Sequence, residues 1–147
     1  MAYKSASVAR TLCEKAGWTL TNLQLQKILY LAQMVYMGKH GGRRLIDDSF
    51  EAWEYGPVLP SVYHKVKIFG GNPVRDIFFG EEPITDNDDA TFIESAAREL
   101  GSVSPGKLVA ITHSDEGAWV KHYHPNRRNV RIPDADIYDE YKVRFSK

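Results

Sequence analysis

The sequence predicts a mainly α fold of the α+β class, a single compact helical domain over residues 1–147 with a small β-hairpin. Three observations support this prediction. Apolar residues recur at helical spacing in several segments, and capping residues or glycines mark many of their ends. One short segment, residues 50–55, alternates in the manner of a strand. The length is that of one ordinary domain, and no linker or low-complexity tract divides the chain.

The longest helix is predicted over residues 21–38. Thr21 and Gln24 have the spacing of a capping box, in which each side chain satisfies the other residue's backbone N–H. The apolar residues that follow form two strips at 100° per residue, and Gly38 ends the pattern. Only one narrow face of this helix is therefore expected to contact water, which predicts a central position in the fold.

Further helices are predicted from their starts and stops. They cover residues 5–17, with Ser5 or Ser7 as the cap and Gly17 as the left-handed residue at the end, residues 60–69 from Pro60, residues 86–101, residues 104–112 from Ser104, and residues 133–145. Acidic residues at 86, 88 and 89 lie at the N-terminus of the helix predicted over 86–101, where they interact favourably with the positive end of the helix dipole. The last helix is expected to bury Ile137, Tyr138, Tyr141 and Phe145.

The segments between helices give weaker signals. Residues 39–49 are predicted to be a loop or the start of a hairpin, and a short strand is predicted at 77–79. Gly56 and Pro57 are expected to end the strand at 50–55 and turn the chain into the next helix. If Trp53 and Tyr55 alternate across this strand, they point to opposite sides. We assign Trp53 to the core and Tyr55 to the surface.

Charge argues against a protein that coats nucleic acid. The chain has 19 basic and 19 acidic residues, whereas extensive phosphate contact requires an excess of Lys and Arg. Two dense basic pairs, Arg43–Arg44 and Arg127–Arg128, leave open the alternative of a DNA-binding regulator. Nucleic acid is nevertheless not the expected partner.

The single Cys13 cannot form an internal disulfide, and its helical neighbours predict a buried thiol. The N-terminus lacks a signal-peptide core, and no apolar run has the roughly 20 residues of a spanning helix. We therefore expect a cytoplasmic protein that does not enter a membrane.

Histidines suggest an alternative of another class, an enzyme. His113 precedes Asp115 and Glu116, and His122 and His124 could share a metal in an extended segment. Two ligands do not complete a zinc site, and no nucleophile, phosphate loop or cofactor motif accompanies His113. We expect no catalytic residue, no metal and no cofactor.

Three segments resemble a known family in their order and spacing. They read LTNLQLQKILYLAQ at 20–33, FEAWEYGPVLPSVYHKVKIFG at 50–70 and LVAITHSDEGAW at 108–119. These segments resemble the Panacea domain, also described as the SocA-like or GepA-like phage-associated family. The aromatic middle segment is the most specific of the three, and their spread makes the match span most of the domain.

The resemblance implies a mostly helical antitoxin of a toxin–antitoxin system, without enzymatic activity, that neutralises a cognate toxin by direct protein contact. The SocA-like branch is associated with presenting the toxin to a cytosolic protease of the AAA+ class, so protease presentation stays open. Self-association of the protein is a separate open alternative. Aromatic side chains supply much of the energy of protein interfaces. The residues expected to bind the partner are Trp53, Tyr55, Tyr63, His113 and Trp119.

Overall fold

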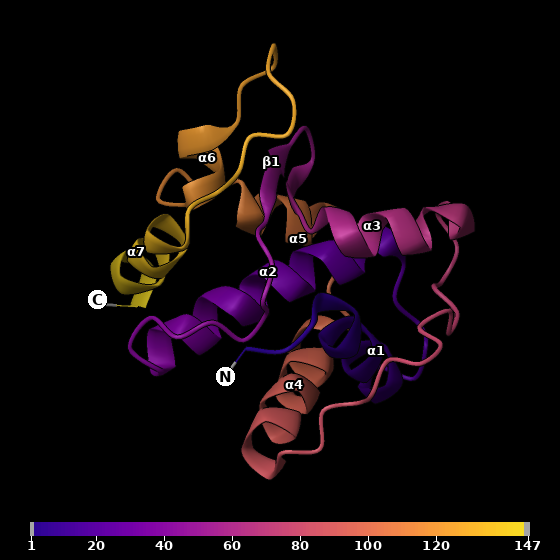
Figure 1. Ribbon diagram of the computed structural model, residues 1–147. Helices are drawn as coiled ribbons and strands as arrows, with labels where there is room; N and C mark the ends of the chain where they lie inside the picture. The colour runs from indigo at the N-terminus through magenta and orange to yellow at the C-terminus, as the bar shows by residue number, and fades with distance from the viewer. Residues whose placement is uncertain (1, 146–147) are drawn as a thin grey trace.

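A single long helix, α2 (Asn22–Lys39), runs through the middle of the fold. The computed structural model describes residues 2–145. In Figure 1, α1 and α4 lie below α2, whereas α6, α7 and the hairpin lie above it or to its left. The other elements are α1 (Ser5–Lys15), β1 (Glu51–Trp53), β2 (Gly56–Val58), α3 (Pro60–Val66), η1 (Lys67–Phe69), α4 (Asn87–Leu100), α5 (Pro105–Thr112), α6 (Ala118–His122) and α7 (Asp134–Phe145). This arrangement confirms the predicted mainly helical fold with a small hairpin.

The predicted capping box starts α2. The Gln24 N–H donates to Thr21 Oγ1 (3.3 Å), and the Thr21 N–H donates to Gln24 Oε1 (3.0 Å). Beyond the first turn every residue from 25 to 34 is buried, so the central position is confirmed. The expected narrow wet face is wrong for this stretch, because other elements cover the helix on all sides. No helix within residues 2–145 combines the length and apolar character needed to cross a membrane.

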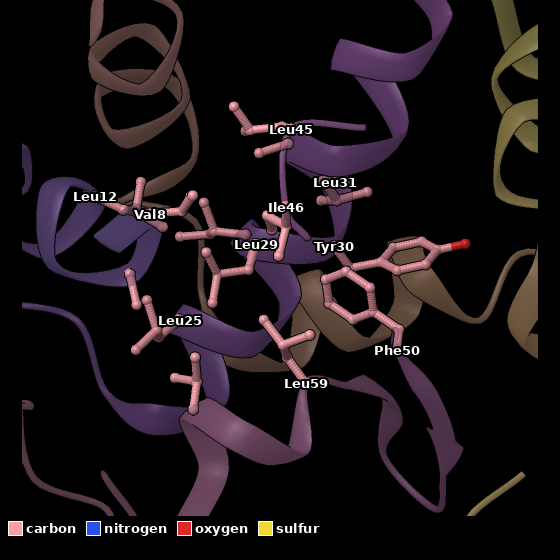
Figure 2. Close-up of a cluster of buried hydrophobic side chains, with 14 of the residues drawn as sticks. Val8, Leu12, Leu25, Leu29, Tyr30, Leu31, Leu45, Ile46, Phe50 and Leu59 are labelled. Atoms are coloured by element: carbon pink, nitrogen blue, oxygen red, sulfur yellow. The ribbon is translucent and has the colours of Figure 1, made fainter. Parts of the chain in front are cut away.

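The hydrophobic core is built around α2. Figure 2 shows side chains from α1, α2 and the segments after α2 packed together, among them Val8, Leu12, Leu25, Leu29, Tyr30, Leu31, Leu45, Ile46, Phe50 and Leu59. The rings of Tyr30 and Phe50 meet edge to face, with 5.3 Å between centroids. Full burial of one such side chain contributes about 1.5–3 kcal/mol to folding. The core therefore depends on apolar contacts to every side of one helix.

The loop after α2 is anchored by a buried glutamine. Gln33 Oε1 accepts hydrogen bonds from the N–H groups of Leu45 and Ile46, both 2.9 Å, and Gln33 Nε2 donates to the Ile46 carbonyl (3.2 Å). Tyr3 extends this arrangement, since its N–H donates to Leu45 and its carbonyl accepts from Asp47. Residues 40–50 thus form an ordered loop, not the start of a hairpin.

The hairpin differs from its prediction. β1 and β2 are antiparallel and pair Glu51 with Val58 and Trp53 with Gly56, so the turn falls at residues 54 and 55. The expectation that Gly56 and Pro57 turn the chain into α3 is wrong, because both residues belong to β2. Proline suits this position because it has no N–H to donate, and β2 is an edge strand of a two-stranded sheet.

The outer edge of β1 is covered by the segment before α7. The Ala52 N–H donates to the Val130 carbonyl, and the Ile132 N–H donates to the Phe50 carbonyl, both at 2.8 Å. Ile132 is buried. The polar segment between α6 and α7 is therefore tied to the hairpin.

Most other helices follow the sequence prediction. α4 starts after Asp86, whose carboxylate accepts from the Asp89 N–H (3.0 Å), and α5 starts after Ser104, whose hydroxyl accepts from the Lys107 N–H (3.3 Å). Gly17 has a left-handed φ of 72°, as expected after α1. Cys13 is fully buried, as predicted.

Several local features differ from the prediction. Lys4, without a side-chain bond, caps α1, because Ser5 and Ser7 both lie within the helix. No strand forms at 77–79, and Phe79 is 84% exposed. Phe145 is 57% exposed instead of buried. The short helix α6 has no counterpart in the prediction.

The contact between α2 and α7 depends on a glycine in α2, which has no side chain. A Cβ at Gly38 would lie 2.1 Å from the ring carbons of Tyr141, so the ring packs directly on the helix backbone. We predict that Gly38→Ala lowers the free energy of unfolding by about 1–3 kcal/mol, although alanine favours helix more than glycine does. Chemical denaturation measures this change.

A control for this prediction is Gly106→Ala in α5. A Cβ there meets nothing within 4 Å, so alanine should be neutral or add up to about 1 kcal/mol. If Gly38→Ala were as stable as Gly106→Ala, the close packing of Tyr141 on α2 would be wrong.

Candidate functional site

The residues predicted to bind a partner come together around the hairpin. The rings of Trp53 and Tyr63 meet at a centroid distance of 4.8 Å, and the indole Nε1–H of Trp119 donates to the Trp53 carbonyl (2.7 Å). His113 stacks on Trp119, with centroids 3.7 Å apart and planes inclined by 7°. The backbone of Tyr55 contacts the His113 ring. Residues about 60 positions apart in sequence thus form one cluster.

The residues of this cluster differ in their exposure to solvent. Trp119 is buried, and His113 is half-buried beneath the hairpin. Tyr55 is 64% exposed, which confirms its outward assignment, and a hydrogen bond to Glu54 raises the pKa of its hydroxyl. Trp53 and Tyr63 are half-buried. Trp53 was therefore wrongly assigned to the core: Ala52 is the buried residue of β1, and Trp53 ends the strand before the turn.

A surface cavity of about 390 Å³ lies between α2, the hairpin and α3, and we call it the hairpin groove. Aromatic rings form much of its wall. The lining residues are Asn22, Leu23, Gln26, Lys27, Trp53, Glu54, Tyr55, Val58, Tyr63 and Gly70.

A fully buried lysine supports the hairpin beside this groove. Lys27 Nζ donates to the Pro57 carbonyl (2.9 Å), and neighbouring Gln26 Oε1 accepts from the Leu59 N–H (2.8 Å). No carboxylate within the described residues forms an ion pair with Lys27, and burial lowers its pKa from 10.5 to about 7. Sequence reasoning missed Lys27, although a lysine next to Ile28 in a helix expected to be central is a usable signal.

Gly56 allows the hairpin to approach the lysine. Its φ of 115° is rarely adopted by other residues, and a Cβ would lie 2.9 Å from Thr112 Oγ1 and 3.1 Å from Lys27 Cε. The second strand therefore lies directly on α2 and α5.

His113 is the second ionisable group beneath the hairpin. Burial lowers its pKa, and the nearby charge of Lys27 lowers it further, whereas the backbone of Tyr55 opposes the change. His113 Nε2 is buried without a hydrogen-bond partner among the described residues. Asp115 and Glu116, the acid–base partners considered for an enzyme, are exposed. The ring of His113 packs face to face on Trp119.

The alternative metal ligands do not converge. His122 lies in α6 with Nε2 2.6 Å from Asp136 Oδ2, whereas His124 Nδ1 accepts from the Asn126 N–H (3.1 Å). Within residues 2–145, no three His, Cys, Asp or Glu side chains are grouped so that they could hold a metal ion.

The two basic pairs lie in different parts of the molecule. Arg43 and Arg44 follow α2, where Arg44 Nε is 3.1 Å from Asp134 Oδ2. Arg127 and Arg128 belong to the loop between α6 and α7, at the opposite end of the view in Figure 1. The structure does not join the four arginines into one basic surface.

The fold and the convergent motif residues agree with the family resemblance. The family model described as "Antitoxin SocA-like, Panacea domain" matches residues 25–120, a range that includes the hairpin, His113 and Trp119. The chain belongs to this SocA-like, Panacea-domain antitoxin family.

One relative is similar over nearly the whole chain. It is Antitoxin SocA of Caulobacter vibrioides (strain NA1000 / CB15N), 34% identical over 158 aligned positions that cover 96% of this chain and 82% of the relative. No solved structure matches the chain significantly.

The low pKa of Lys27 predicts a pH dependence of stability. Because the folded-state pKa (about 7) is below the unfolded value (10.5), the unfolded chain holds a proton that the folded chain releases between these values. Lys27 therefore makes stability rise with pH above 7, by at most about 1.4 kcal/mol per unit. Denaturation at pH 7.5 and 8.5 should show a steeper rise for the wild type than for Lys27→Met.

Comparing the wild type with Lys27→Met cancels the pH-dependent contributions to stability that both proteins share. One of these comes from Cys13, because burial raises the pKa of its thiol to about 12. Equal slopes in the two proteins would contradict a buried, largely neutral Lys27.

Proposed function

We propose that this protein is an antitoxin that neutralises a cognate toxin by binding it directly, with the hairpin groove as the contact surface. The observation that carries this proposal is that two of the three motif segments line the groove and the third supports the hairpin. Helix α2 supplies its floor, the hairpin and α3 supply its aromatic wall, and Trp119 supports the hairpin from below. Partly exposed Trp and Tyr rings on a fixed support are the features of a protein-binding hot spot.

Contact through side chains is favoured over strand addition. A partner strand needs a free sheet edge, but the backbone of residues 130–132 covers the outer edge of β1. The outer edge of β2 faces α2, and the Pro57 carbonyl already accepts a hydrogen bond from Lys27 Nζ. The toxin would therefore meet the rings of Trp53, Tyr55 and Tyr63 instead of the hairpin backbone.

Neutralisation by binding can act in two ways. The bound antitoxin can block the toxin's working surface, or it can present the toxin to a cytosolic AAA+ protease, as the family resemblance implies. The half-life of the toxin after its synthesis is stopped separates these mechanisms, since only presentation shortens it. Self-association through the same groove would compete with the toxin, and sedimentation of the free protein measures it.

Tyr55 provides the direct test of the groove. Tyr55→Ala should leave thermal unfolding unchanged, because the ring is 64% exposed, yet it should weaken toxin binding by about 2 kcal/mol, or roughly 30-fold. The product of the adjacent gene is the toxin to test. Growth on co-expression reports neutralisation, and calorimetry with purified proteins reports affinity.

Phe79→Ala is a matched control, because Phe79 is an equally large ring that is 84% exposed outside the groove. Loss of neutralisation by Phe79→Ala but not by Tyr55→Ala would place the contact surface elsewhere. A neighbouring gene product that is harmless alone, or toxic despite the wild-type protein, would contradict the antitoxin function itself.

A further inference from the structure

A second cavity lies on the other side of the hairpin from the groove. It has a volume of about 460 Å³, and we call it the arginine pocket. Trp53 and Glu54 line both cavities, so the two form neighbouring parts of one surface around the hairpin. The arginine pocket adds Tyr123, Arg127 and Arg128.

The two arginines of this pocket are exposed and have no carboxylate partner within the described residues. Some other arginines form ion pairs, such as Arg10 with Glu14 at 2.9 Å and Arg144 with buried Glu140 at 2.9 Å. Neither Arg127 nor Arg128 forms an ion pair in the part of the chain that the structure describes. Their guanidinium groups are thus available for an external anion.

Rigid aromatic rings stand beside these charges. Tyr123 stacks on Trp119 at a centroid distance of 4.7 Å, with planes inclined by 12°, and Trp119 stacks in turn on His113. The indole N–H of Trp119 also holds the Trp53 carbonyl. Two ring-bearing residues of the pocket, Tyr123 and Trp53, are therefore positioned by the same buried tryptophan.

We propose that the arginine pocket receives an acidic side chain of the toxin, an aspartate or glutamate that neighbours an apolar residue. This inference rests on the proposed antitoxin function and specifies the chemistry of the partner. A carboxylate matches the fork of an arginine guanidinium, and the adjacent apolar residue can pack on Tyr123 and Trp53. Glu54, whose carboxylate accepts from the Tyr55 hydroxyl, disfavours partners that place a carboxylate nearer the hairpin tip.

A protein partner fits the observations better than nucleic acid does. Nucleic-acid affinity grows with the number of phosphates that are neutralised, and this pocket offers two arginines. The second basic pair lies in the segment after α2 and does not line the pocket, and Arg44 is already paired with Asp134. The net charge of the whole chain is zero.

The test is charge reversal of the pocket. Arg127→Glu combined with Arg128→Glu should unfold at the wild-type temperature but bind the purified product of the adjacent gene at least about tenfold more weakly. The wild-type affinity should also fall with salt more steeply than that of the variant. Arg75→Glu combined with Arg98→Glu makes the same charge change at exposed sites outside the pocket and should bind as the wild type does.

Three results would overturn the inference. If the two double variants bound the toxin with equal affinity, the pocket inference would be wrong. Toxin binding by the wild type, and with it the proposed function, would be unaffected. Absence of wild-type binding would refute both. Duplex DNA bound at low salt by the wild type but not by the pocket variant, with unchanged toxin affinity, would assign the arginines to nucleic acid.

Discussion

The burial of α2 on all sides is the constraint on which the rest of the structure depends. Ten consecutive residues, 25–34, have no face toward water, so the polar side chains among them must find partners inside the protein. Backbone groups of two distant segments supply partners for three of them: Gln33 binds residues 45 and 46, whereas Gln26 and Lys27 bind Leu59 and Pro57. The core helix thus also fixes the irregular segments by specific hydrogen bonds.

This constraint links the core to the candidate binding surface. β2 is held by Lys27 from α2, β1 is held by the segment before α7, and Trp119 holds the carbonyl at the end of β1. A hairpin of six strand residues is marginal alone, so its geometry comes from these supports. The hairpin groove and the arginine pocket are consequently formed before any partner binds, which reduces the ordering cost of association.

Local signals in the sequence predicted the local features of the fold. The capping box at Thr21, the cap at Ser104 and the left-handed Gly17 were found because they depend on residues a few positions apart. The hairpin turn was misplaced because Gly56 and Pro57 resemble a turn, whereas their roles depend on contact with Thr112 and α2, far away in sequence.

The candidate site could be predicted only in part, for the same physical reason. The motif residues include the rings that cluster around the hairpin, but nothing local showed which rings would be covered. The ring of Trp53 packs on Tyr63 of the next helix, and the acceptor of buried Lys27 is 30 positions away, so neither environment could be read from adjacent residues. Family resemblance linked the three segments as one pattern, which periodicity alone does not do.

Native-state hydrogen exchange of the loop amides tests the central claim most directly. If Gln26 and Gln33 anchor the loops to α2, the amides of Leu59, Leu45 and Ile46 should exchange as slowly as those in the middle of α2, because both require opening of the core. Exchange of these three amides at the rate of unprotected loops, while α2 stays protected, would contradict the account.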